Sequence, residues 1–360
     1  MSEIRQAVIM AGGEGTRLRP LTNTRPKPLL PVLGRPCIEH TVRSMVEAGV
    51  EEIFLALGYR SQDIVDALGD GKDLGARIVY AYEEVPMGTV GAVKLLEDRL
   101  DRTFLVGSGD TLTDANIADL VRFHNERGAI ATMGLTEVEH PEQFGIVGTS
   151  TDGRIERFKE KPRPEEVFSN VINAGTYVLD KKVLDFVPAE TKYDFSKNLF
   201  PDLLAKGKPL YARKLGGYWK DIGRPMDLLE ANLCMAERTG EPTFIPGMIT
   251  EGNIVAQTVN GFGGEIIGPA YLGDGVSIEP GARVGSSCIG DGSSIGEGAM
   301  VEGSLLLGGC QVAPGAIIMS SILGQGCRIG PGVSLQGSVL GDGVSLEGPS
   351  SIIDKVIPQP

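Results

Sequence analysis

Residues that would supply a disulfide framework, a metal–thiolate centre or a membrane anchor are scarce in this chain of 360 residues. The five cysteines show no Cys-x-x-Cys spacing, which disfavours a zinc site or a disulfide scaffold and fits a reducing compartment. The N-terminal apolar run is too short for a secretory core, and no stretch is long enough to span a bilayer. We therefore expect a cytoplasmic protein with no membrane partner.

Positive charge is also in deficit. The chain has 34 lysines and arginines against 47 aspartates and glutamates, a formal net charge of −13. Nucleic acid and anionic membrane surfaces need a basic field, so neither is expected as a partner. A small anionic ligand is still compatible with this balance, because it needs only a few local cations. At this length, two domains can each bury a core of their own.

The first two thirds of the chain alternate short strand-like runs with amphipathic helical patterns. The strand-like runs are 6–12, 51–58, 76–83 and 102–110, and the helical patterns are 37–50, 61–70 and 89–100. Repeated strand–helix–strand order predicts a mainly parallel sheet with helices on both faces. We expect residues 1–235 to form this Rossmann-like α/β domain.

From about Gly263 the pattern changes to dense glycine with regularly spaced aliphatic residues. Aliphatic side chains recur every 17 residues at Leu272, Ile289, Leu306, Leu323 and Leu340, and mostly every six residues within each repeat. This hexapeptide repeat is similar to that of left-handed parallel β-helix domains, in which stacked coils bury one continuous core. We expect a linker at 236–262 and a β-helix at 263–360.

The glycine-rich segment after the first strand reads AGGEGTRLRPLTNTRPKPLLPV, from Ala11 to Val32. The glycine spacing is wrong for the GxGxxG dinucleotide motif, and the GK[ST] of a Walker loop is missing. A tight turn without a ligand is one interpretation. The other is a backbone cradle for a nucleoside triphosphate, because arginines and a lysine crowd this one segment of an acidic chain.

The same segment resembles the signature GGxGTRLxPLTxxxPKPxxPV of the sugar-1-phosphate nucleotidyltransferases, also called nucleoside-diphosphate-sugar pyrophosphorylases. The resemblance continues in order through EEVPMGTVGA, VGSGDTL, FGIV, FKEKP, NAGTYVL and YWKDIGRP, and covers roughly residues 4–235. It implies that a sugar 1-phosphate attacks the α-phosphorus of a nucleoside triphosphate and releases pyrophosphate. Several segments look closest to mannose-1-phosphate guanylyltransferases that carry a C-terminal β-helix.

The resemblance assigns roles to individual residues. Arg17 and Lys27 are the catalytic cations, facing the pyrophosphate side and the α-phosphate. The nucleotide-binding residues are Ala11, Gly12, Gly13, Gly15, Thr16, Glu83, Gly88 and Thr89. The sugar-phosphate-binding residues are Gly145, Glu160, Lys161, Asn173 and Gly175. Asp110 and Asp221 are the expected ligands of Mg²⁺, a hard cation that suits carboxylate and phosphate oxygens. Arg19 and Arg25 are expected only in loop salt bridges or supporting roles.

The choice of base depends on Glu83. Relatives that use uracil or thymine often carry glutamine at this place, whereas a carboxylate can only accept hydrogen bonds. Guanine presents two donors on its Watson–Crick edge and uracil or thymine one, so Glu83 favours GTP. Glu84 is an alternative base reader. We expect GDP-mannose synthesis, with a UTP- or dTTP-dependent glucose-1-phosphate enzyme as the alternative.

The repeat domain has no histidine, the base that hexapeptide acyltransferases usually need. The three histidines, His40, His124 and His140, all precede it, and we expect them at helix or loop surfaces. We therefore predict no acetyltransferase activity and a structural role for the β-helix, including self-association into a homo-oligomer. A catalytically inactive sensor of nucleotide-sugars is the alternative of another class, disfavoured because Arg17, Lys27, Asp110 and Asp221 are all present.

Overall fold

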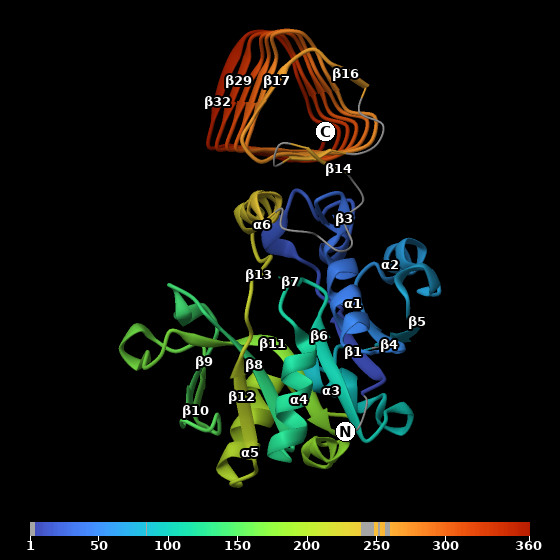
Figure 1. Ribbon diagram of the computed structural model, residues 1–360, viewed down its shortest axis with the longest axis vertical. Coiled ribbons are helices and arrows are strands. Elements are labelled where there is room, and N and C mark those ends of the chain that lie inside the picture. Colours follow the sequence, from blue (N-terminus) through green and yellow to red (C-terminus); the bar gives the residue numbers. More distant parts are fainter. Residues whose placement is uncertain (1–3, 84, 239–247, 251–252, 256–259) are drawn as a thin grey trace. The chain divides into compact units, whose positions relative to one another are not determined.

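The computed structural model describes residues 4–83, 85–238, 248–250, 253–255 and 260–360 (Figure 1). Within it the chain divides into two compact units, one formed by Met1–Gly13 and Ile38–Lys220 and the other by Glu14–Cys37 and Asp221–Pro360. Much of the predicted linker 236–262 lies outside the described residues. Contacts group Glu14–Cys37 with the β-helix, and the predicted domain boundaries at 235 and 263 stay predictions.

The first unit is built on a nine-stranded mixed sheet. Seven of its strands follow the order β10-β9-β11-β6-β1-β4-β5, β8 pairs with β11, and β12 pairs with β8. Its strands are β1 (Gln6–Ala11), β4 (Glu52–Leu57), β5 (Arg77–Tyr82), β6 (Thr103–Ser108), β8 (Ala131–Glu137), β9 (Gly145–Thr149), β10 (Ile155–Glu160), β11 (Val171–Asp180) and β12 (Leu210–Lys214). The four strands β6, β1, β4 and β5 are parallel, as the strand–helix alternation predicts. Strand β11 pairs antiparallel with β6, β8 and β9, which makes the whole sheet mixed.

The helices of the chain are α1 (Cys37–Glu47), α2 (Ser61–Leu68), α3 (Thr89–Lys94), α4 (Ile117–Arg127), α5 (Phe200–Ala205) and α6 (Pro225–Glu237). Short 3-10 turns lie at Thr16–Leu18, Lys27–Leu29, Lys72–Leu74, Glu97–Arg99, Pro141–Gln143, Pro164–Glu166 and Lys181–Phe186, and a π-helical turn at Phe195–Leu199. Two small ribbons pair β2 (Pro31–Val32) with β3 (Arg35–Pro36) and β7 (Thr111–Thr113) with β13 (Trp219–Asp221). No helix of the described residues is long and apolar enough to cross a membrane.

The core of the first unit is a continuous cluster of buried apolar side chains. Val8 and Val106, from neighbouring parallel strands, are fully buried, as are Phe54 and Phe104. Around Tyr177 the rings of Phe195 and Phe200 pack at centroid distances of 4.9 and 5.0 Å. This core fixes the sheet, so the loops at the strand ends have a rigid support.

The second unit contains three parallel sheets that wind as a left-handed β-helix with a triangular cross-section (Figure 1). The first sheet has β14 (Met248–Thr250), β15 (Asn253–Val255), β18 (Tyr271–Leu272), β21 (Cys288–Ile289), β24 (Leu305–Leu306), β27 (Ile322–Leu323), β30 (Val339–Leu340) and β33 (Val356–Ile357). The second has β16 (Asn260–Phe262), β19 (Ser277–Ile278), β22 (Ser294–Ile295), β25 (Gln311–Val312), β28 (Arg328–Ile329) and β31 (Ser345–Leu346). The third has β17 (Glu265–Ile267), β20 (Arg283–Gly285), β23 (Met300–Glu302), β26 (Ile317–Met319), β29 (Val333–Gln336) and β32 (Ser350–Ile353). Among the described residues of these sheets, only β14 pairs antiparallel, with β15.

The 17-residue repeat appears directly in the strand register. Leu272, Ile289, Leu306, Leu323 and Leu340 follow one another in register along the first sheet, and all five are fully buried. The α/β fold followed by a β-helix is therefore confirmed. At one corner of four successive coils stand the buried serines Ser287, Ser304, Ser321 and Ser338. The Oγ of Ser321 accepts the backbone N–H of Ser338 at 3.1 Å and donates to the carbonyl of Met319 at 2.7 Å.

Candidate active site

The glycine loop begins where β1 ends, at the edge of the sheet where the carboxyl ends of three parallel strands meet. Gly12 follows Ala11, and a Cβ on Gly12 would lie 3.5 Å from the backbone nitrogen of Gly58, just beyond β4. The same Cβ would lie 3.7 Å from Oε2 of Glu83, which follows β5. Ligands of open α/β sheets bind at this edge. The structure thus brings Ala11, Gly12 and Glu83 together, as the sequence predicts.

Glu83 is half-buried, and burial raises the pKa of its carboxyl above the usual value. The backbone N–H of Met87 donates to Oε1 of Glu83 at 3.3 Å and opposes this shift. Its second oxygen, Oε2, is the one directed at Gly12. Glu83 therefore has a carboxylate oxygen beside the glycine loop. Glu84, the alternative base reader, lies outside the described residues.

Gly88 and Thr89 are engaged with the segment 193–195. Gly88 has a φ of 77°, and a Cβ there would lie 2.6 Å from the carbonyl oxygen of Tyr193, so only glycine fits. The Thr89 backbone N–H donates to Asp194 at 3.2 Å, and the Thr89 hydroxyl accepts the N–H of Phe195 at 2.9 Å. These contacts give both residues a packing role, and their part in base binding stays a prediction.

Asp110 follows β6, the strand next to β1. The Gly109 N–H donates to the carbonyl of Met10 at 2.9 Å, and a Cβ on Gly109 would lie 3.4 Å from Cβ of Ala11. This places Asp110 beside the start of the glycine loop. The hydroxyl of Ser108 donates to Oδ1 of Asp110 and fixes the carboxylate. Ser108 was not identified from the sequence, although its place two residues before Asp110, at the end of β6, could have suggested it.

Gly145 and Glu160 face each other in the antiparallel pair of β9 and β10. A Cβ on Gly145 would lie 2.8 Å from Oε2 of Glu160, so the glycine makes room for that carboxylate. Burial raises the pKa of Glu160, while Lys161 and Lys197 oppose the shift. Lys161 adopts a left-handed conformation with a φ of 45°, and its side chain is exposed. The structure thus places Gly145, Glu160 and Lys161 together.

Asn173 is held in the same unit by three hydrogen bonds. Its amide nitrogen donates to the hydroxyls of Tyr177 at 2.8 Å and Ser196 at 3.2 Å, and its Oδ1 accepts the N–H of Gly175 at 2.9 Å. Ser196 also bonds Glu160, which joins Asn173 to the Gly145–Glu160 pair. Ser196 and Lys197 were missed from the sequence. Their signal in the sequence is the polar run 196–198 between the two apolar residues that begin and end the π-helical turn.

In the second unit, the proline-braced loop, residues 15–32, folds back on itself. Gly15 has a φ of 64°, and a Cβ there would lie 2.9 Å from Cβ of Lys27, so Gly15 is required on both counts. The Thr22 hydroxyl donates to the Gly15 carbonyl at 2.8 Å. Thr16 and Arg17, in the 3-10 turn that follows, are exposed to solvent. The loop thereby presents Arg17 outward while it packs against Lys27.

Lys27 forms an ion pair with Asp221, with 3.6 Å between Nζ and Oδ1. The lysine is only 8% exposed, and Asp221 is half-buried. A Cβ on Gly223 would lie 3.2 Å from Oδ2 of Asp221 and 3.5 Å from Nη2 of Arg17. Within this unit the structure therefore gathers the two candidate catalytic cations and one candidate metal ligand around a single turn, Asp221–Gly223.

Arg19 is exposed, and Arg25 pairs with Asp342 at 2.6 Å between Nη2 and Oδ2. The salt bridge expected for Arg25 is thus present. The histidine expectation is partly wrong, because His40 and His124 are buried and only His140 is exposed. Apolar residues packed around His40 and His124 bury both side chains, and the sequence next to a histidine does not reveal such packing.

The sequence predicts Asp110, in the first unit, and Asp221, in the second, as ligands of a divalent cation. Two carboxylates plus phosphate oxygens are the donor set that Mg²⁺ prefers, and each carboxylate is fixed by a neighbour, Ser108 or Lys27. Among the described residues, no group of three or more His, Cys, Asp or Glu side chains could hold a metal ion. The chemistry of the two carboxylates suits Mg²⁺, and their joint role as its ligands stays a prediction.

Comparisons with known proteins extend these observations. Residues 6–238 match the family model described as "Nucleotidyl transferase", and residues 266–359 match the model described as "GMPPB C-terminal domain". The chain is 33% identical to a UTP--glucose-1-phosphate uridylyltransferase of Synechocystis, covering 78% of this chain and 76% of that protein. It is 34% identical to a mannose-1-phosphate guanylyltransferase of Mycobacterium tuberculosis, covering 77% of each.

A crystal structure from Bacillus anthracis, of a protein provisionally named glucose-1-phosphate thymidylyltransferase, is also similar. It superposes with a TM-score of 0.59 at 27% identity and covers 64% of this chain and 94% of that one. The family model spans well over half of the chain, and the relatives match it over most of their length. The chain therefore belongs to the nucleotidyl transferase family and is a sugar-1-phosphate nucleotidyltransferase.

Proposed function

We propose that the chain transfers GMP from GTP to mannose 1-phosphate, giving GDP-mannose and pyrophosphate. The observation that carries this choice is the Glu83 carboxylate beside Gly12 in the glycine loop. Guanine offers two hydrogen-bond donors to such an acceptor, and uracil or thymine offers one. The C-terminal family model and the Mycobacterium relative support the same choice by their names.

In the proposed reaction a phosphate oxygen of the sugar 1-phosphate forms a bond to the α-phosphorus of the nucleotide. The bond from that phosphorus to the bridging oxygen breaks, and pyrophosphate leaves with the electron pair. The attacking oxygen is already an anion, so no protein base or nucleophile is needed. The protein has to align two mutually repelling anions and stabilise the charge that develops.

Each candidate residue has one task in this scheme. Lys27, desolvated and oriented by Asp221, stabilises the charge at the α-phosphate. Arg17 binds the departing pyrophosphate, and backbone N–H groups of Gly12 to Thr16 bind the remaining phosphate oxygens. Lys161 binds the sugar phosphate, and Glu160 and Asn173 orient the sugar hydroxyls. Mg²⁺, held by Asp110 and Asp221, would neutralise phosphate charge when bound.

Two alternatives have specific support. A UTP- or dTTP-dependent glucose-1-phosphate enzyme is favoured by the names of the Synechocystis relative and the Bacillus anthracis structure. A non-catalytic nucleotide-sugar sensor would keep the fold but needs no catalytic cation. The buried Lys27, paired with Asp221, argues against a sensor. Removing a cation from water costs free energy, and a sensor gives this lysine no catalytic role that would explain the cost.

The β-helix is proposed to be structural and to mediate self-association into a homo-oligomer, with no acetyltransferase activity. Both remain predictions from the sequence, in which no histidine follows His140. Size-exclusion chromatography with light scattering, on the full chain, would test the oligomer.

The experiment for the reaction measures pyrophosphate release by the purified chain with Mg²⁺. It crosses GTP, UTP, dTTP, ATP and CTP with mannose, glucose, galactose and N-acetylglucosamine 1-phosphates. A maximum for GTP with mannose 1-phosphate supports the proposal. A maximum for UTP or dTTP with glucose 1-phosphate keeps the mechanism but overturns the specificity. No turnover with any pair favours the sensor.

A further inference from the structure

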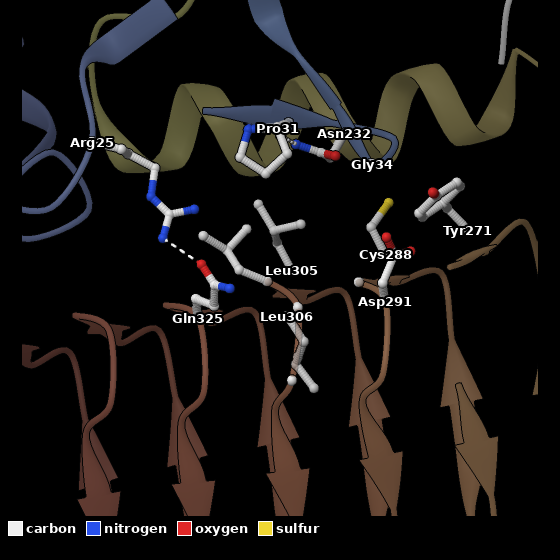
Figure 2. Close-up of a pocket in the computed structure, with 14 residues that line it drawn as sticks. Arg25, Pro31, Gly34, Asn232, Tyr271, Cys288, Asp291, Leu305, Leu306 and Gln325 are labelled. Carbon is white, nitrogen blue, oxygen red and sulfur yellow. Dashed lines mark hydrogen bonds between the residues drawn. The ribbon is translucent and has the colours of Figure 1, made fainter. Parts of the chain in front are cut away.

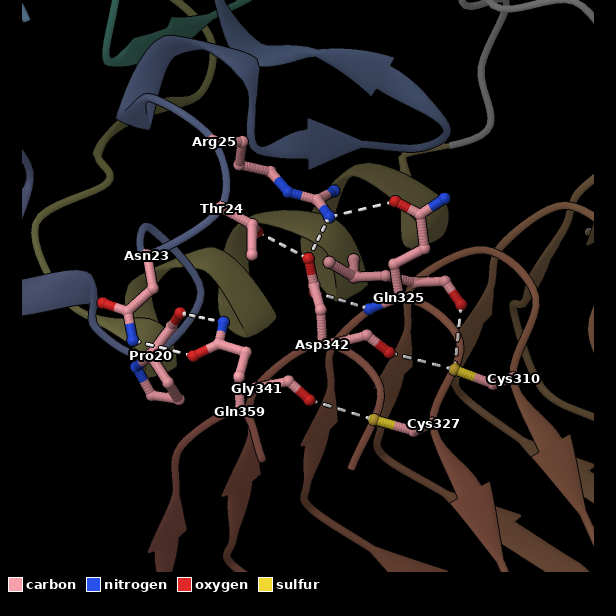
Figure 3. A network of polar contacts seen from close by, with 12 residues as sticks. Pro20, Asn23, Thr24, Arg25, Cys310, Gln325, Cys327, Gly341, Asp342 and Gln359 are labelled. Carbon is pink, nitrogen blue, oxygen red and sulfur yellow. Dashed lines mark hydrogen bonds and ion pairs between the residues drawn. The ribbon is translucent and has the colours of Figure 1, made fainter. Parts of the chain in front are cut away.

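The turn that precedes Lys27 is held by side chains from the last coils of the β-helix, all within the second unit (Figure 3). Oδ2 of Asp342 accepts hydrogen bonds from Arg25 Nη2 at 2.6 Å and from the Thr24 hydroxyl at 2.5 Å. Gln359 accepts from the Asn23 amide at 2.7 Å and donates to the Pro20 carbonyl at 2.9 Å. These four hydrogen bonds join Pro20, Asn23, Thr24 and Arg25 to the β-helix.

Asp342 is itself fixed by the coil below it. Its other oxygen, Oδ1, accepts the backbone N–H of Gln325 at 2.7 Å, and the Gln325 side chain accepts from Arg25 at 3.0 Å. The side chains of Arg25 and Asp342 are only 20% and 16% exposed. A shielded, charge-assisted pair of this kind is stronger than an exposed ion pair and more sharply directed.

Beside Arg25, the space between this segment and the β-helix is not filled by side chains. A cavity of about 440 Å³ lies there, lined by Pro31, Gly34 and Asn232 on one side and by Leu305 and Leu306 on the other (Figure 2). Pro20, Leu21 and Pro26 pack the turn from within, and the cavity interrupts the packing beside Arg25. Next to this cavity, polar contacts of Arg25, Thr24 and Asn23 connect the turn to the β-helix.

The held turn is directly connected to the candidate catalytic residues. Only Pro26 separates Arg25 from Lys27, and Lys27 pairs with Asp221. On the other side, the Thr22 hydroxyl bonds Gly15, which packs against Lys27 and precedes Arg17. A displacement of residues 20–25 would therefore move both cations relative to their partners.

We propose that Asp342 and Gln359 are positioning residues for the nucleotide loop, so that the end of the β-helix sets the geometry of Arg17 and Lys27. In this way the β-helix influences the rate of nucleotidyl transfer without touching the substrates. The proposal rests on the function proposed above. Misplacing a reacting group by a small distance lowers the rate of a positioned reaction while leaving the fold intact.

The test compares Asp342→Asn with a matched control, Asp291→Asn, in the full-length protein. Asp291 lies three coils earlier at the equivalent position and accepts the Asp274 N–H at 2.8 Å, so both variants weaken the same corner contact. The contacts to Thr24 and Arg25, however, belong to Asp342. Gln359→Ala is a second test variant, near the chain end.

Two readouts are needed, kcat and KM for the preferred substrates and hydrogen exchange of the loop amides. The N–H groups of Leu21 and Asn23 bond within the loop and report its order without any substrate. For Asp342→Asn and Gln359→Ala we expect exchange at these amides to rise about tenfold. We expect kcat to fall about tenfold as well, with a smaller change in KM and thermal midpoints close to that of Asp291→Asn.

The outcomes separate the two proposals. Unchanged loop exchange in both test variants, or faster exchange with unchanged kcat, overturns the positioning role. A loss of kcat in Asp291→Asn equal to that in Asp342→Asn overturns it too, because the effect would then be a general one of the β-helix. If the unmodified chain turns over no substrate pair, the proposed function fails, and the exchange measurement still decides whether the β-helix orders the loop.

Discussion

The ammonium group of Lys27 lies 3.6 Å from Oδ1 of Asp221, and this ion pair joins the proline-braced loop to the segment that precedes α6. Both residues carry proposed roles at the phosphates, one as a cation and one as a metal ligand. A metal ion and an ammonium group that share one carboxylate would each limit where the other can sit. The pair therefore gives Lys27 a fixed place before substrate arrives.

Replacing Lys27 with Met keeps the length of the side chain and removes its charge. We expect kcat to fall by about 10²–10³, since a single preorganised electrostatic contact at a transition state has this size. Arg19→Met is the matched control, because Arg19 lies on the same loop and is exposed. Steady-state kinetics with both variants measure the difference. Equal activity of the two would remove Lys27 from the mechanism.

Asp110→Asn tests the proposed metal ligand that follows β6. The amide keeps the shape and can still accept from Ser108, but it lacks the charge that binds a divalent cation. We expect nearly all turnover to be lost, with the thermal midpoint unchanged and with a weaker response of that midpoint to Mg²⁺ plus nucleotide. Asp101→Asn, an exposed residue before the amino end of the same strand, is the control. Full activity of Asp110→Asn would contradict the assignment.

Glu83→Gln tests the base reader. Glutamine adds a donor where guanine also has donors, so the contact with guanine is partly lost, whereas a carbonyl of uracil or thymine gains a partner. We expect kcat/KM for GTP to fall about tenfold or more and the value for UTP or dTTP to rise. The ratio of the two constants is the measurement. An unchanged ratio would mean that Glu83 does not read the base.

His124 predicts how the stability of the first unit depends on pH. Burial lowers the pKa of this histidine from 6.5 to about 4, and its Nδ1 lies 2.9 Å from the hydroxyl of Thr132. The unfolded chain therefore binds a proton at a higher pH than the folded one. Its contribution to stability is fully present above pH 6.5 and is lost as the pH falls from 6.5 to about 4.

A pKa shift of this size changes the free energy of unfolding by up to about 3 kcal/mol. We expect the thermal midpoint of the wild-type chain to fall more than that of His124→Gln between pH 7 and pH 4.5. Comparing the two proteins removes the contribution of the carboxylates, which both share. Parallel midpoint curves would show that His124 titrates normally in the folded protein.

The serine corner predicts a local cost in the β-helix. Ser321→Ala removes a buried hydroxyl that both donates to Met319 and accepts from Ser338. We expect the free energy of unfolding of the β-helix to fall by about 1–3 kcal/mol, because an N–H is left without its partner in a dry interior. Urea unfolding of Ser321→Ala and of the exposed Ser345→Ala measures this. A loss of equal size in both variants would contradict the account.

The repeating part of the fold could be predicted from the sequence because its register is periodic. One inward aliphatic residue every 17 positions leaves Leu272 and Ile289 no alternative stacking that keeps both buried. The parallel strands β1, β4, β5 and β6 were predictable because each is an apolar run in a part of the chain where such runs alternate with amphipathic helical patterns. Antiparallel β11 was not, because its partners β6, β8 and β9 are set by tertiary packing and not by a local pattern.

Candidate residues could be identified from the signature, but not the contacts that support them. The sequence offers Arg25 as one more loop cation, and its partner Asp342 lies in a repeat where many coils look alike. Ser108 and Ser196 fix Asp110 and Asn173 through single hydrogen bonds. Such bonds depend on the meeting of distant segments, which composition and spacing do not specify.

The most direct measurement of the central claim is a competition experiment. Equal concentrations of GTP and UTP are offered with equal concentrations of mannose and glucose 1-phosphates, and mass spectrometry identifies the nucleotide-sugars at low conversion. The product ratio then equals the ratio of kcat/KM values. We expect GDP-mannose as the dominant product. Dominant UDP-glucose would contradict it, because Glu83 beside Gly12 would then not select guanine.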